Sequence, residues 1–234
     1  MKAPSNGWKR MNDESLSTYS LYDLLNNRIP AIRVPQFLSA QEYKAGYFGM
    51  VKEANVLQQR FIEEAGVDVV ERVRNSIAKA AGIPVRVATE GDRKYFAGLL
   101  RVINSPALIH SDYAPYDAPG WKIGQIVSQI TWNIFLKQVR GGESVVYNRY
   151  WRGKEDDEVF KKTAPSYGYQ TLAVENAEFK VIPAVEGDLT FMNSRNFHEV
   201  RPLDPPNEEW RYTISSFVGL LPSSAGGPEL ILWS

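Results

Sequence analysis

The sequence predicts an α+β protein in which helices come first and an antiparallel β region follows. Up to residue 84 the apolar residues recur with a helical period, and beyond it they alternate with polar residues in short segments. Turn-forming stretches such as Asn-Ser-Pro, Gly-Gly and Asp-Pro-Pro separate these segments. About eight or nine strands of this kind favour a sandwich or barrel of the jelly-roll type.

The length favours a single domain over residues 1–234. The chain has 234 residues, and all-β barrels often reach ~250 residues as one domain. We expect a polar arm over 1–17, a mainly helical region over 18–84 and the jelly-roll core over 85–234. The charged, aperiodic segment 151–170 is expected to be a long loop, either a lid over the barrel mouth or a solvated surface loop.

Two or three helices are expected before the strands. A short one is predicted over residues 18–27. A capping box at Ser39 and Glu42 marks the start of a helix from Ala40 to about Val56. A further helix begins after Asp68 and ends at Gly82. We expect these helices to pack on the β core.

Composition excludes several classes of function. Lys plus Arg and Asp plus Glu each number 27, so the formal net charge is zero. This balance argues against a nucleic-acid or anionic-membrane partner. The absence of Cys excludes disulfides, thiolate metal sites and Cys nucleophiles. No run approaches the ~18 apolar residues of a membrane span. The polar N-terminus lacks a secretory signal. We therefore expect a cytoplasmic protein, and the oligomeric state is left open.

The two histidines of the chain indicate a metal site. His110 and Asp112 lie at the end of a predicted strand, where residues i and i+2 point to the same side. His198 lies on a distant predicted strand. Two His and one carboxylate form the facial triad that holds Fe(II) and leaves three positions open. A three-ligand zinc site is the rival interpretation of the same residues.

Arg211 favours iron over zinc. It follows His198 and opens a predicted strand on which Arg211, Thr213 and Ser215 share one face. A guanidinium beside a hydroxyl, aimed into a barrel mouth, suits a bidentate grip on a carboxylate. An iron site that uses a dicarboxylic keto acid needs this grip, whereas a hydrolytic zinc site does not.

The pattern His110-x-Asp112, then His198, then Arg211-x-Thr213, resembles the 2-oxoglutarate and Fe(II) dependent dioxygenases. Gly141-Gly142-Glu143 resembles the family's turn between core strands, and the stretches around Gly187-Asp188-Leu189 and His198 also match. The resemblance covers roughly residues 95–222. Gly-Gly-Glu-Ser-Val-Val-Tyr and the closing Leu-Trp-Ser are similar to a small-molecule branch that includes the hapalindole and welwitindolinone chlorinases and stand-alone amino-acid hydroxylases. In the chlorinases a small residue replaces the metal carboxylate. Asp112 is present here, which favours a hydroxylase over a halogenase.

The resemblance implies a double-stranded β-helix of the cupin-like, jelly-roll kind. It implies that His110, Asp112 and His198 bind Fe(II), and that the far carboxylate of 2-oxoglutarate pairs with Arg211, helped by Thr213 or Ser215. With O2, the reaction would release succinate and CO2 and oxidise an unactivated C–H of a small molecule. Hydroxylation is the expected outcome, with desaturation or cyclisation left open. The setting would be natural product biosynthesis or amino-acid modification.

Other residues are weaker candidates for the same site. Arg101 is placed to meet an anionic group of either substrate or co-substrate. Tyr113 and Tyr116 are expected to line the entrance as substrate contacts. Gln129 and Asn133 alternate on one strand face and are expected to bond 2-oxoglutarate. Trp132 points the other way, into the core, and Arg201 is expected at the surface.

Three alternatives stay open. The first is a peptidyl or protein hydroxylase of the same superfamily. The second is a non-catalytic jelly-roll protein that binds a metal, which would have no use for the keto-acid clamp at Arg211. The third is a metal-dependent hydrolase or isomerase on a similar barrel, which the same arginine disfavours.

Overall fold

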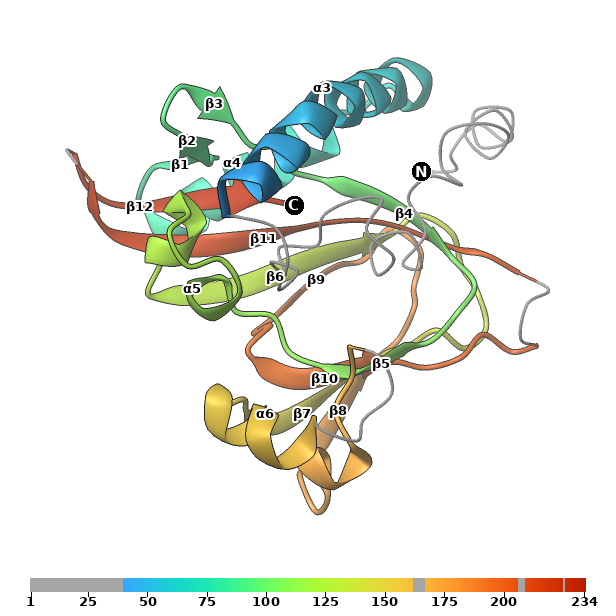
Figure 1. The fold of residues 1–234 in the computed structure, drawn as a ribbon. Coiled ribbons are helices and arrows are strands. Elements are labelled where there is room, and N and C mark those ends of the chain that lie inside the picture. Colours follow the sequence, from blue (N-terminus) through green and yellow to red (C-terminus); the bar gives the residue numbers. More distant parts are fainter. Residues whose placement is uncertain (1–39, 162–166, 206–208, 225) are drawn as a thin grey trace.

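The computed structural model describes residues 40–161, 167–205, 209–224 and 226–234, which form a mixed α/β fold with a sheet-rich core (Figure 1). Two sheets dominate it. The larger sheet holds β1 (Val85–Val87), β12 (Gly227–Trp233), β11 (Arg211–Ser224), β6 (Ser128–Phe135) and β9 (Leu189–Met192) in that order, and β4 (Leu99–Ile103) also pairs with β11. The smaller sheet has the order β5 (Ala107–His110), β10 (Asn196–Val200), β7 (Ser144–Tyr150) and β8 (Phe179–Ile182). These strands fall in or overlap the segments that the alternating pattern predicts, except β1, which precedes the first expected strand.

Strand β11 is the central strand of the larger sheet, because it pairs with β4, β6 and β12 along its length. These pairings are antiparallel, and β1 and β12 pair in parallel. In Figure 1, α3 and α4 lie on the outer side of the larger sheet, and α6 lies beyond the smaller sheet. The helices therefore leave the space between the two sheets for the site.

The two long helices agree with the sequence patterns except in the length of the first. Helix α3 spans Ala40–Ala65, so the expected end near Val56 was wrong. The helix continues because buried apolar residues such as Leu57 and Phe61 recur at helical spacing, and no Gly or Pro interrupts them before Gly66. The expected helix over 18–27 and the capping residue Ser39 lie outside the described residues.

Helix α4 (Val69–Ala81) has the predicted caps. The Asp68 side chain accepts a hydrogen bond from the Glu71 backbone N–H at 2.8 Å, and Gly82 has a φ of 67° at the other end. Val73 and Ile77 of α4 pack with the fully buried Trp132 of β6. Trp132 is thus a core residue, as its position on the strand predicted.

A cluster around Glu90 connects three parts of the fold. Glu90 belongs to the hairpin of β2 (Thr89–Glu90) and β3 (Arg93–Lys94). Its carboxylate accepts hydrogen bonds from Lys44 of α3 (2.6 Å), Tyr95 (2.7 Å) and the backbone N–H of Lys122 (2.7 Å) in η2 (Lys122–Gln125). Burial raises the pKa of this carboxyl group, but these hydrogen bonds outweigh burial and hold the pKa below its ordinary value.

The charged segment 151–170 is not a loop throughout, which corrects the expectation. Helix α6 (Lys154–Phe160) forms inside it, and η3 (Thr171–Val174) follows. The fully buried Asp156 carboxylate organises the helix start, because it accepts hydrogen bonds from the Arg152 backbone N–H (2.8 Å) and the Arg149 guanidinium (2.9 Å). Few apolar residues were needed to build this helix, so hydrophobic periodicity did not reveal it.

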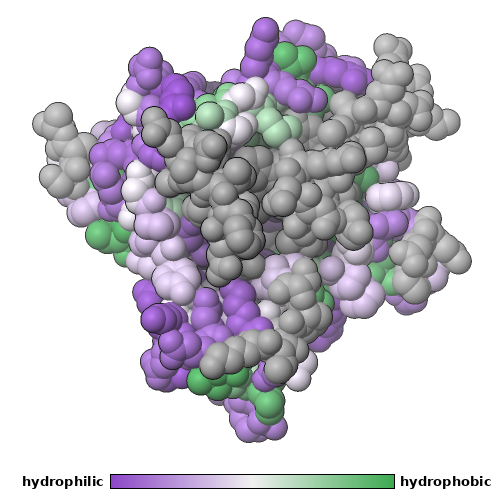
Figure 2. Space-filling model, in the orientation of Figure 1, coloured by the Kyte–Doolittle hydropathy of each residue, from purple (hydrophilic) through white to green (hydrophobic). Residues whose placement is uncertain are grey.

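The described face in Figure 2 is mostly hydrophilic, with hydrophobic residues gathered in separate patches. Among the helices of the described part, none is long and apolar enough to cross a membrane.

Candidate metal centre and adjoining cavity

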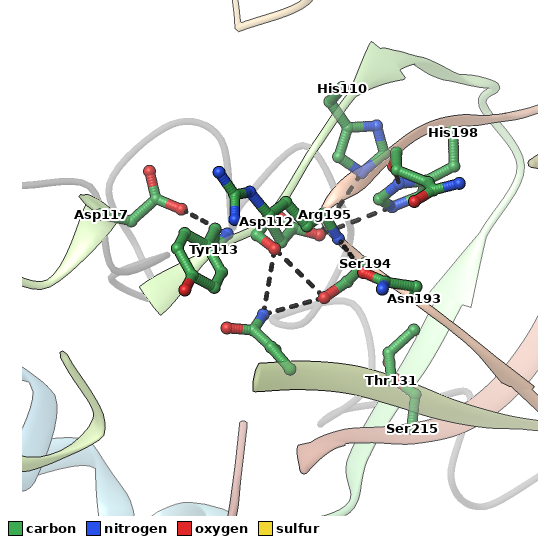
Figure 3. Close-up of polar contacts among 12 residues, drawn as sticks. His110, Asp112, Tyr113, Asp117, Thr131, Asn193, Ser194, Arg195, His198 and Ser215 are labelled. Atoms are coloured by element: carbon green, nitrogen blue, oxygen red, sulfur yellow. Dashed lines mark hydrogen bonds and ion pairs between the residues drawn. The ribbon is translucent and has the colours of Figure 1, made fainter. Parts of the chain in front are cut away.

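The two histidines face each other across a strand pair. β5 and β10 are antiparallel, and His110 is the direct partner of His198 in their register. The two imidazole rings lie with centroids 4.1 Å apart, and Figure 3 shows both side chains directed toward Asp112. Residues far apart in sequence are thus brought together by strand pairing, which sequence spacing alone does not reveal.

Asp112 lies just past the end of β5 and is fastened through its backbone. Its N–H donates to the Ser194 carbonyl at 2.9 Å, and its own carbonyl accepts from the Ser194 hydroxyl and the Gln129 amide, both at 3.1 Å. Gln129 also donates to the Ser194 hydroxyl at 2.9 Å. Ser194 and Gln129 are buried. Because these three hydrogen bonds fix the backbone of Asp112, its carboxylate is held next to the two histidines.

The three side chains fit a divalent metal. Asp112 Oδ2 lies 3.5 Å from His198 Nε2 and 3.8 Å from His110 Nε2. The ligand atoms of all three residues lie within 4.8 Å of one another. Ligands bound at ~2.1 Å from one ion lie about 3 to 4 Å apart, so only small movements would close the site. This donor set, on one face of an octahedron, matches non-haem Fe(II).

Hydrogen bonds fix which imidazole nitrogen faces the site. Nδ1 of His110 lies 2.6 Å from the Leu108 carbonyl oxygen, and Nδ1 of His198 lies 2.9 Å from the Asn196 carbonyl oxygen. A carbonyl oxygen can only accept, so each Nδ1 carries the proton. Each Nε2 therefore presents its lone pair, as a metal ligand must.

A cavity of about 230 Å³ opens beside the triad. Residues of both sheets line it, so it lies between them. Its polar lining includes Arg101, Gln129, Thr131, Asn133, Ser144, Thr190, Arg211 and Ser215. Its apolar lining includes Leu99, Ile103, Ile182, Met192, Val200 and Phe217. A lining that combines apolar side chains with a few polar groups is typical of small-molecule sites.

Arg211 enters this cavity at the start of β11. It is 7% exposed, and its Nη1 donates to the Gly142 carbonyl at 3.1 Å. Gly142 has a φ of +69°, and a Cβ there would lie 3.3 Å from Arg211 Cδ, so a glycine in this turn leaves room for the guanidinium. Burial lowers the pKa of Arg211 to about 10, and repulsion from Arg101 adds to this effect.

The hydroxyl and amide candidates near Arg211 differ in position. Ser215 lines the cavity and accepts a 2.7 Å hydrogen bond from Arg101 Nη1. Thr213 is 1% exposed, and it is not among the residues that line the cavity. Asn133 lines the cavity, opposite Ser215 in the β6–β11 register.

The amide group of Gln129 is engaged by protein partners. Both of its amide protons are used by Asp112 and Ser194, and its oxygen accepts from the Ala114 N–H at 2.8 Å. Gln129 therefore supports Asp112.

The two tyrosines expected at the entrance are separated. Tyr113 lines the cavity, and the guanidinium of Arg195 lies 4.6 Å from its ring (Figure 3). Tyr116 does not line the cavity, which corrects its placement as a substrate contact. It belongs to α5 (Ala114–Asp117) and packs edge-on against Trp151, with ring centroids 4.5 Å apart. Its hydroxyl donates to Asp157 at 3.2 Å. Arg201 is exposed, as expected.

Tyr167 is a site residue that sequence reasoning missed. It lines the cavity and lies edge-on to His110, with ring centroids 5.7 Å apart. Its hydroxyl oxygen accepts a hydrogen bond from the Leu108 N–H at 2.9 Å. The carbonyl of the same Leu108 is the partner of His110 Nδ1. Close packing at Gly168, where a Cβ would lie 2.8 Å from Leu108, brings the tyrosine onto β5. The aromatic-glycine-aromatic run Tyr167–Tyr169 in a charged segment was the available signal.

Two known sequences are similar to this chain. Leucinostatins biosynthesis cluster protein S of Purpureocillium lilacinum is 52% identical over 209 residues, which make up 88% of this chain and 86% of that protein. L-gamma-glutamyl-L-propargylglycine hydroxylase of Streptantibioticus cattleyicolor is 30% identical over 169 residues, which make up 71% of this chain and 59% of that protein. No protein-family model matches the sequence.

Solved structures share the fold at low sequence identity. Two crystal structures of an N-substituted L-amino acid dioxygenase from Burkholderia ambifaria superpose with TM-scores of 0.60 and 0.58, both at 16% identity. They cover 97% and 99% of this chain and 80% and 84% of those chains, and the second is a complex with alpha-KG.

The chain thus shares its fold with a dioxygenase that was solved in complex with alpha-KG, and His110, Asp112 and His198 offer the donor set of a non-haem Fe(II) site. The chain belongs to the same family as leucinostatins biosynthesis cluster protein S. The resemblance to the small-molecule branch that includes the chlorinases stays a prediction.

Proposed function

We propose that this protein is an Fe(II)- and 2-oxoglutarate-dependent oxygenase that hydroxylates an unactivated C–H of a small molecule and releases succinate and CO2. One observation carries the proposal. The His110, Asp112 and His198 ligand atoms and the buried Arg211 guanidinium open into the same cavity. That arrangement has one end for a metal and another for a distant carboxylate. Desaturation or cyclisation would need the same residues.

We also infer that residues 1–234 form one domain around a double-stranded β-helix, or jelly roll. The support is that residues of both sheets line a single cavity, and that β11 joins β4, β6 and β12 in one continuous sheet. Closely spaced strand ends around one cavity suit a cupin-like barrel.

The chain's own residues would divide the work as follows. His110, Asp112 and His198 hold the iron, and the bound iron with 2-oxoglutarate supplies the oxidising power for the C–H. Arg211 binds the far carboxylate of 2-oxoglutarate. Ser215, which lines the cavity, is a better-placed helper than Thr213. Asn133 is a further contact to the co-substrate. The apolar walls exclude water and place the C–H that reacts.

The substrate class is proposed from the cavity and the relatives. A cavity of about 230 Å³ suits a small molecule. The names of two similar proteins specify a gamma-glutamyl amino acid and N-substituted L-amino acids as their substrates. Both support an amino-acid derivative for this chain, with Tyr113 as a wall of its site. The presence of Asp112 favours hydroxylation over halogenation. A peptidyl hydroxylase is the second candidate, because one side chain of a peptide could enter the cavity.

Anaerobic binding followed by aeration tests the proposal. Fe(II) and 2-oxoglutarate are added without oxygen, and the weak visible charge-transfer absorption of the chelate is recorded. Air is then admitted and succinate is measured, with Asp112→Ala as control. We expect the absorption band and succinate with the parent protein only. A parent that gives neither signal above the Asp112→Ala control would refute the oxygenase.

A further inference from the structure

We propose that Arg101 binds a carboxylate of the substrate, so the substrate is a small acid; this rests on the proposed function above. Arg101 belongs to β4, and its direct partner on β11 is Thr213. Residues paired in this way lie on the same face of a sheet, as do residues two apart on one strand. Arg101 therefore shares a face with Arg211 and Ser215, and both arginines line the cavity.

Both guanidinium groups lack an anionic partner within the described part of the chain. Arg101 Nη1 donates to the Ser215 hydroxyl at 2.7 Å, and Arg211 Nη1 donates to the Gly142 carbonyl at 3.1 Å. The Nε of each is buried without a hydrogen-bond partner. The ion pairs among the described residues include neither arginine. Arg211 is buried and Arg101 is partly buried. A cation shielded from water without an anionic partner is costly, so these two neighbouring arginines mark places where ligands bring negative charge.

One molecule of 2-oxoglutarate has too few free carboxylates for both. Its first carboxylate is needed at the metal, which leaves the far carboxylate for one arginine. The second arginine is then left without a carboxylate from 2-oxoglutarate. The other acid that lines the cavity, Asp117, is engaged in accepting the Tyr113 N–H at 2.9 Å.

Strand register shows which arginine is nearer the metal end. Along β11, Arg211 is followed by Ser215, whose hydroxyl accepts from Arg101, and then by Gly219, the direct partner of Gln129 on β6. The Gln129 amide donates to the Asp112 carbonyl at 3.1 Å. Arg101 thus meets β11 between Arg211 and the position that is paired with Gln129 beside Asp112. The substrate must place its C–H near the metal, so Arg101 is the arginine that an acidic group of the substrate would meet.

The rival assignment is that both arginines grip the far carboxylate of 2-oxoglutarate. Substituting Arg101 separates the two. Arg101→Met removes the charge at similar length, and Arg101→Lys retains it. Arg201→Met is the matched control, because Arg201 is exposed and does not line the cavity. Thermal unfolding first establishes that each variant is folded. If Arg101→Met does not fold, the comparison is made with Arg101→Lys.

Calorimetry of the anaerobic Fe(II) protein then gives two dissociation constants. The first is for 2-oxoglutarate. The second, at saturating 2-oxoglutarate, is for a panel of acids (L-gamma-glutamyl-L-propargylglycine, N-acetyl-L-leucine and other N-acyl L-amino acids) and their carboxamides. We expect Arg101→Met to bind 2-oxoglutarate within threefold of the parent. We expect it to bind the parent's best acid at least tenfold more weakly, with recovery in Arg101→Lys. The carboxamide should not distinguish parent from variant.

Either of two results would overturn the inference. One is a tenfold or greater loss of 2-oxoglutarate affinity in Arg101→Met, which assigns Arg101 to the co-substrate. The other is a parent that binds none of the acids, or binds acid and carboxamide alike. A parent that does not bind 2-oxoglutarate at all contradicts the proposed function instead, so the two failures can be told apart.

Discussion

Replacing Arg211 by Met is predicted to weaken 2-oxoglutarate binding strongly. The guanidinium is 7% exposed and lies in a cavity, so the far carboxylate of the co-substrate would remain buried without its cation. Removing one partner of a buried, hydrogen-bonded charge pair costs about 2 to 5 kcal/mol. At ~1.4 kcal/mol for each factor of ten, the dissociation constant should rise about 30- to 4,000-fold.

The same substitution is predicted not to destabilise the protein without ligand. In that state Arg211 is buried with the Gly142 carbonyl as its hydrogen-bond partner, and burial lowers its pKa to about 10. Losing that hydrogen bond lowers the free energy of unfolding by about 1 kcal/mol. Removing an unpaired buried cation raises the free energy of unfolding by as much or more. The unfolding temperature without 2-oxoglutarate should therefore equal or exceed that of the parent. The rise in unfolding temperature on adding 2-oxoglutarate should be lost.

Calorimetric titration of the anaerobic Fe(II) protein with 2-oxoglutarate measures the first effect, and thermal unfolding measures the second. Arg201→Met controls for the loss of one positive charge. An Arg211→Met protein that binds 2-oxoglutarate within threefold of the parent would refute the assignment of the clamp.

Three further predictions concern the surroundings of the site. Tyr167→Phe removes the hydroxyl that holds β5 next to His110. The affinity for Mn(II), measured by electron paramagnetic resonance, should therefore fall about tenfold. An unchanged affinity would contradict this role of Tyr167. Gly142→Ala, at a φ of +69° and with a Cβ 3.0 Å from its nearest neighbour, should lower the free energy of unfolding in urea by about 1 to 3 kcal/mol, and a smaller loss would argue against strain there. Glu90 has its pKa raised by burial but lowered overall by hydrogen bonds, first that of Lys122. Its contribution is therefore present above the ordinary pKa of 4.5 and lost as pH falls through the lower folded value. The urea midpoints of parent and Glu90→Gln should therefore converge as the pH falls below 4.5 and through the lowered folded pKa; a constant gap would disprove this.

The sequence predicted those features that local patterns determine. Apart from β1, the strands of the two main sheets overlap the alternating segments. Helix α4 is bounded by Asp68 and Gly82, as predicted, because its caps are local interactions. His110, Asp112 and His198 could be grouped because the residue types suggest one chemistry, and strand register then brings them together.

Features that depend on distant partners were not predictable in this way. Helix α6 forms around the buried Asp156 carboxylate rather than an apolar stripe. Gln129 lines the cavity as expected, but its amide protons are consumed by Asp112 and Ser194, which lie elsewhere in the sequence. Tyr116 follows the metal motif closely, yet its contact with Asp157 takes it away from the cavity. Strand alternation indicates the face of a residue and not the partner that it meets there.

The most direct test of the central claim follows the oxygen atoms. The Fe(II) protein is supplied with 2-oxoglutarate under ¹⁸O₂, and the succinate is analysed by mass spectrometry, with Asp112→Ala as control. We predict succinate that carries one labelled oxygen atom from the parent and none from the control. Succinate without the label, or equal amounts from both proteins, would contradict an oxygenase built on His110, Asp112 and His198.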